Sequence, residues 1–88
     1  MRVVLALAES DERGARYDGA LYTPAERFDY RVTIALPDGT VDIAAVREDT
    51  PATLPVDVLR AIARTVVKDA LSVSPPVWPR RVVRWRDK

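Results

Sequence analysis

The chain has 88 residues and a mass of 9.8 kDa, which is the size of one small domain. It contains no His and no Cys, so zinc sites of the usual kind, Ser-His or Cys-His nucleophiles and disulfide bonds are excluded. The net charge of +1 conceals an asymmetry, because residues 1–50 carry −4 and residues 51–88 carry +5. Such a chain can hold its two halves together by complementary charge, or present two charged surfaces to different partners.

A nearly continuous apolar run over residues 2–8 predicts a strand that is covered on both faces and central in its sheet. The run is too short for a secretory signal peptide, and no stretch of the chain is long enough to span a membrane, so we expect a cytoplasmic protein with no membrane partner. Residues 9–25 contain charged side chains together with Gly14, Gly19 and Pro24. We expect a long loop there, with a short extended piece around residues 20–23.

Apolar side chains then occupy every second position from Phe28 to Leu36. This period of two predicts a strand with one buried face and one wet face. Pro, Asp and Gly at positions 37–39 provide turn chemistry, and residues 41–47 return as the partner strand of an antiparallel hairpin.

The register of this hairpin depends on the length of its loop. A two-residue loop places Ile34 opposite Ile43, which matches the two apolar faces. A three-residue loop that includes Pro37 places Ile34 opposite Asp42, although it suits the turn residues better. We favour the two-residue loop, because a slip by one residue exchanges the buried and solvated faces.

The second half predicts a helix, a proline-rich connection and a last strand. Thr53 is the expected N-cap of a helix that ends near Ser72. Its apolar residues form one stripe, which packs on the sheet: Leu59, Ile62, Ala63, Val66 and Ala70. Residues 73–79 contain three prolines and run extended, with Trp78 as an apolar anchor. Residues 80–86 predict a short strand whose two faces both carry arginine, which suits the edge of a sheet.

The predicted order is therefore strand, loop, strand, strand, helix, strand. It indicates an α+β fold in which a small antiparallel sheet of three to four strands carries one helix on one face. Residues 1–88 form a single domain, with the long loop at about 9–25 and the proline-rich connection at about 73–79.

The missing catalytic residue types favour a protein that is not an enzyme and that uses no cofactor. One helix covers only one face of a sheet, which leaves the other face free for a second copy. We therefore expect a small protein-interaction or self-association module, whose partner is another protein or a second copy in a homodimer. Aromatic residues beside arginines in the predicted loop are typical of contact surfaces, and the candidate contact residues are Arg13, Arg16, Tyr17 and Tyr22.

An alternative function is nucleic-acid binding by the basic helix face and the C-terminal strand. Cations neutralise phosphates, and an indole between two arginines can stack on a base. The residues of this candidate surface are Arg60, Arg64, Lys68, Arg80, Arg81, Arg84, Trp85 and Arg86. The plainer interpretation is that these arginines protect a sheet edge and pair with the acidic first half.

Metal-dependent catalysis ranks third among the functions. Two acidic clusters follow the first and third strands, and their carboxylates could meet around a divalent ion: Glu9, Asp11 and Glu12 in the first, Glu48 and Asp49 in the second. Their spacing matches no calcium loop, and adjacent acidic residues in turns are usually solvated. We therefore expect no metal site.

Overall fold

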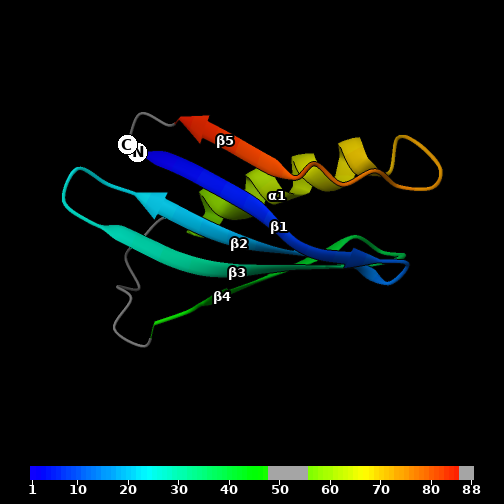
Figure 1. Ribbon diagram of the computed structural model, residues 1–88, viewed down its shortest axis with the longest axis horizontal. Coiled ribbons are helices and arrows are strands. Elements are labelled where there is room, and N and C mark those ends of the chain that lie inside the picture. Colours follow the sequence, from blue (N-terminus) through cyan, green and yellow to red (C-terminus); the bar gives the residue numbers. More distant parts are fainter. Residues whose placement is uncertain (48–55, 86–88) are drawn as a thin grey trace.

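The computed structural model of the protein describes residues 1–47 and 56–85. Its elements are β1 (Arg2–Asp11), β2 (Gly14–Tyr22), β3 (Arg27–Ala35), β4 (Thr40–Ala45), α1 (Val56–Ala70) and β5 (Arg81–Trp85). The strands form one antiparallel sheet in the order β4-β3-β2-β1-β5, and α1 lies behind it (Figure 1). The α+β class and the single helix are as predicted, but the sheet has five strands instead of three to four.

The additional strand is β2, and it corrects the prediction of a long loop over residues 9–25. β1 continues to Asp11, and β2 begins at Gly14 directly after a tight turn. Gly14 has a φ of +148°, and a Cβ at this position would collide with the carbonyl oxygen of Ile34. At Gly19 a Cβ would lie 3.1 Å from Cδ2 of Leu5. These glycines permit a close approach within the sheet, although glycine ordinarily counts against a strand.

A β-bulge at Ala8 explains why the apolar pattern of the first strand stops there. Leu7 pairs with Tyr17, and Glu9 pairs with Arg16, so Ala8 is an extra residue with no partner in β2. The extra residue changes the phase of the alternation. Glu9 therefore lies on the face opposite to Leu7, although the two residues are two positions apart.

The core lies between α1 and one face of the sheet. The buried residues of this face are Val3, Leu5, Ala15, Tyr17, Leu21, Tyr30, Val32, Ile34 and Val82. The prediction that the first strand is covered on both faces is wrong, because Ala6 is exposed and Val4 is half-buried on the other side. The strand is interior in a different sense, since it lies between β2 and β5.

The β3–β4 hairpin has neither of the two registers considered from the sequence. Ala35 pairs with Thr40, so the loop contains residues 36–39, and Ile34 faces Val41. The apolar faces still match, because this register differs by two residues from the one favoured. Gly39 closes the turn with a φ of +73° and donates its N–H to the Ala35 carbonyl at 2.8 Å. Glycine adopts this positive φ without strain, whereas a residue with a Cβ would be strained there.

The apolar stripe of α1 is confirmed, since Leu59, Ile62 and Val66 are buried against the sheet. The helix ends at Ala70, before the predicted Ser72, and Thr53 lies outside the described residues. The proline-rich connection brings a half-buried Trp78 against the core, as predicted. No helix in the described ranges is long and apolar enough to cross a membrane.

Candidate functional site

The face of the sheet that α1 leaves uncovered is the candidate site, and we call it the open face (Figure 1). Strand pairing arranges its side chains in rows that cross the strands from β5 to β3. The aromatic row contains Trp85, Arg2, Tyr22 and Arg27. The next row, which we call the valine row, contains Val83, Val4, Ala20 and Asp29. The third, or alanine, row contains Arg81, Ala6, Asp18 and Arg31.

In the aromatic row, arginines alternate with aromatic rings. The guanidinium carbon of Arg2 lies 4.3 Å from the ring centre of Tyr22 and 5.7 Å from that of Trp85. Arg27 approaches the Tyr22 ring from the neighbouring strand, at 5.5 Å. Two guanidinium groups therefore lie close to the Tyr22 ring, where they compete with a stacked nucleobase.

Arg27 is held in this row by an acidic neighbour on its own strand. Its Nε donates a hydrogen bond to Oδ1 of Asp29 at 2.8 Å. This hydrogen bond and the negative charge of Asp29 raise the pKa of Arg27 above its ordinary value. The pair is exposed, so it orients the guanidinium more than it stabilises the fold.

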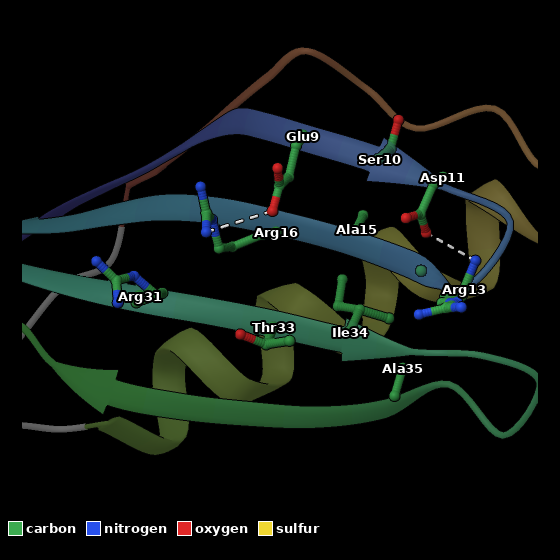
Figure 2. A pocket seen from close by; sticks show the side chains of 11 residues that line it. Glu9, Ser10, Asp11, Arg13, Ala15, Arg16, Arg31, Thr33, Ile34 and Ala35 are labelled. Atoms are coloured by element: carbon green, nitrogen blue, oxygen red, sulfur yellow. Dashed lines mark hydrogen bonds and ion pairs between the residues drawn. The ribbon is translucent and has the colours of Figure 1, made fainter.

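An open hollow of about 400 Å³ lies toward the other end of this face, between β1, β2 and β3 (Figure 2). Figure 2 shows Glu9 and Arg16 reaching toward one another from neighbouring strands, with 3.3 Å between the carboxylate and the guanidinium. Arg31 also lines the hollow, and it makes no ion pair with any residue of the described ranges. The hollow therefore offers charges of both signs, which suits the side chains of a protein partner.

The hollow has little to offer a catalytic reaction. Its hydroxyl groups belong to Ser10 and Thr33. No grouping of three or more metal-ligating side chains occurs within residues 1–47 and 56–85. Asp11, a candidate ligand, accepts a hydrogen bond from the N–H of Arg13 at 2.8 Å. Glu48 and Asp49, the other half of that candidate site, lie outside the described residues.

The candidate protein-contact residues separate in the structure. Arg16 and Tyr22 lie on the open face, and Arg13 is exposed at the turn beside it. Tyr17 was expected to be an exposed loop residue, which is wrong: it is 0% exposed, and its hydroxyl donates to the carbonyl of Pro79 at 2.7 Å. Burial raises the pKa of Tyr17 to about 12.

The basic residues proposed for nucleic-acid binding do not form one surface. Arg81 and Trp85 lie on the open face, where Trp85 is 71% exposed. Arg84 lies on the other face of β5 and donates to the carbonyl of Val83 at 2.8 Å. Arg64 and Lys68 are exposed on α1, behind the sheet.

Of the remaining basic residues, Arg60 donates to the carbonyl of Val41 at 3.3 Å and is half-buried against β4. Arg80 is exposed just before β5, and its carbonyl accepts a hydrogen bond from the N–H of Leu7 at 2.8 Å. Arg86 lies outside the described residues. The helix cations therefore lie on the opposite side of the sheet from Arg81 and Trp85, and the cations of the C-terminal strand are themselves divided between the two faces.

Sequence reasoning missed Arg2, Val4 and Arg31 as surface residues. The alternation of side chains along each strand could have identified them. Arg2, Val4 and Ala6 share one face of β1, and Arg27, Asp29 and Arg31 share one face of β3. No family model, no curated protein and no solved structure matches the chain.

Proposed function

We propose that this protein is a non-catalytic interaction module that self-associates through the open face of its sheet. The observation that carries this proposal is the valine row. A solvated sheet face is ordinarily polar, whereas Val83, Val4 and Ala20 form a continuous apolar line across three strands. Ala20 is already buried within the monomer, and a second protein surface would remove the remaining exposed parts of the half-buried Val4 and Val83 from water.

The size of the open face supports a stable contact. The two longest dimensions of the molecule are 41 Å and 25 Å, and Figure 1 shows the sheet extended in that plane. They bound the face at about 1,000 Å², compared with the roughly 800 Å² that each partner contributes to a standard protein interface. A stable contact with a second copy would therefore use most of the open face.

The charges around the valine row favour a protein over a polyanion. Arg2, Arg16 and Arg31 are interspersed with carboxylates on the same face, and these carboxylates are Glu9, Asp18, Asp29 and Asp42. A nucleic-acid surface gains its affinity from cations that neutralise successive phosphates, and nearby carboxylates oppose that gain. A protein surface of mixed charge is complementary to such a pattern.

Nucleic-acid binding is the second candidate function. It is supported by the exposed indole of Trp85, which lies on the same face as Arg81 and Arg2. It ranks second because two guanidinium groups already lie close to the Tyr22 ring and because the helix cations lie on the other side of the molecule.

The test compares two exposed alanines that receive the same new side chain. Ala6→Glu places a carboxylate in the middle of the open face, whereas Ala61→Glu places one on exposed α1. Sedimentation equilibrium from micromolar to millimolar concentration should show self-association of the wild type and of Ala61→Glu. Ala6→Glu should be monomeric and should retain the wild-type circular dichroism spectrum. A wild type that is monomeric at every concentration would contradict the proposal.

A further inference from the structure

We infer that two copies pack their open faces together with antiparallel strands, about a two-fold axis that crosses the strands between the valine row and the alanine row. This inference rests on the proposed function, because it specifies how the open face meets a second copy. A homodimer interface is isologous, so each contact occurs twice and the face must be complementary to itself.

Rotation about this axis leaves each strand over its counterpart and reverses its direction. The valine row then faces the alanine row of the second copy, and the aromatic row faces the row that contains Glu9, Arg16 and Thr33. On β1, Val4 faces Ala6 of the second copy. Val83 faces Arg81 and Ala20 faces Asp18 of the second copy, so the apolar pair at the centre of the contact is Val4 with Ala6.

The same rotation brings opposite charges together on two strands. On β3, Asp29 faces Arg31 of the second copy. On β1, Arg2 faces Glu9 of the second copy, because the bulge at Ala8 places Glu9 on the open face. On β2, Tyr22 faces Arg16, a further arginine-aromatic contact.

Two alternative two-fold axes bring like charges together. An axis that runs along β2 places Arg2 against Arg27 of the second copy. An axis through the alanine row places Asp18 against Asp18 and Arg31 against Arg31. Like charges that face one another across an interface are strongly unfavourable, so the charges on the open face disfavour both of these axes.

This arrangement is compatible with the ordinary geometry of packed sheets. Two sheets pack about 10 Å apart with their strands within about 30° of alignment, and their side chains interdigitate. Val4, Val83 and Ala20 are short enough to fill the centre of that gap. The longer arginines around them reach carboxylates at the periphery.

The test exchanges the charges of the Asp29–Arg31 contact between two separate chains. In Arg31→Asp alone, two carboxylates face one another at both symmetric contacts, and in Asp29→Arg alone, two guanidinium groups do. Each variant alone should dimerise with a Kd raised by about tenfold or more. In an equimolar mixture both contacts regain opposite charges, and we expect a heterodimer close to wild-type affinity in sedimentation equilibrium.

A second measurement applies if Asp29→Arg, which also loses its contact with Arg27, fails to fold. The chain has no cysteine, so Ala6→Cys introduces a single thiol beside the proposed axis. A short bifunctional thiol reagent should then join two copies of Ala6→Cys, whereas Ala61→Cys on α1 should remain uncrosslinked. Equal crosslinking of the two variants would overturn the inference.

The outcomes separate the inference from the proposed function. Restored dimerisation in the mixture supports both. A mixture that stays dissociated, although wild type dimerises and Ala6→Glu does not, overturns the two-fold arrangement and leaves the open face as the contact surface. A wild type that is monomeric throughout overturns both.

Discussion

The two faces of the sheet differ in chemistry although the same strands build them. On the covered face, Leu5 and Val32 are 0% exposed and pack against α1. On the open face, the residues that alternate with them are arginines, acids, alanines and valines. Volume and apolar contact on the covered face therefore determine the fold, whereas the composition of the open face is less constrained by it.

The largest expected effect is the loss of volume on the covered face. Leu5→Ala removes a fully buried side chain and should lower the free energy of unfolding by about 3 to 4 kcal/mol. The adjacent Ala6→Ser on the open face should change it by less than about 0.5 kcal/mol. Urea unfolding of both variants measures the contrast. Similar losses would mean that the two faces contribute equally to stability.

The next effect is the dependence of stability on alkaline pH. The pKa of Tyr17 is about 12 in the folded protein and 10.0 without burial, so the folded state holds this proton more tightly. The resulting stability is fully present below pH 10 and is lost as the pH rises toward 12. The expected loss is on the order of 2 kcal/mol, measured by urea unfolding at successive pH values.

Tyr17→Phe is the control for this titration, and it should reduce the loss over the same pH interval. Burial also raises the pKa of Tyr30, so part of the pH dependence should persist in the variant. If Tyr17→Phe has the same pH dependence as the wild type, the Tyr17 hydroxyl of the wild type is accessible to solvent.

A smaller effect distinguishes two tyrosines within the covered face. The Tyr17 hydroxyl donates to Pro79, whereas the Tyr30 hydroxyl is shielded from solvent and has no hydrogen-bond partner in the part of the chain that is described. Tyr17→Phe should therefore cost about 1 kcal/mol at neutral pH, and Tyr30→Phe should be neutral or stabilising. Thermal unfolding of both variants tests this order, and a larger cost at Tyr30 would reverse the assignment.

The smallest expected effect is on nucleic-acid binding. Titration of mixed-sequence RNA and DNA oligomers should leave the Trp fluorescence nearly unchanged at low and at raised salt, because carboxylates are interspersed with the arginines of the open face. Saturable quenching that weakens steeply with salt, and that is reduced in Arg81→Ala, would instead establish the second candidate function.

The sequence predicted those elements whose signal is local. Strict alternation identified β3, and the apolar stripe identified the covered face of α1. β2 was missed because Gly14 and Gly19 suggested a loop, whereas their role depends on neighbours far along the chain, Ile34 and Leu5. Local patterns contain no information about such approaches.

The candidate site was harder to predict than the fold. Two members of the aromatic row, Tyr22 and Trp85, were recognised singly as candidate contacts. They lie beside Arg2 only because β1 pairs with both β2 and β5. The pairing of β1 with β5 brings the two ends of the chain together. Tyr17 was misplaced for a related reason, since its burial requires a strand where a loop was expected.

The bulge at Ala8 determines how the first strand responds to a change in its length. The side chain at position 8 is exposed, so its replacement should matter little. Its removal would restore an unbroken ladder in which Leu7 still faces Tyr17 and Glu9 still faces Arg16, on the open face. The bulge thus absorbs one residue of chain length, and neither a deletion nor a substitution at this position should move Glu9 to the covered face.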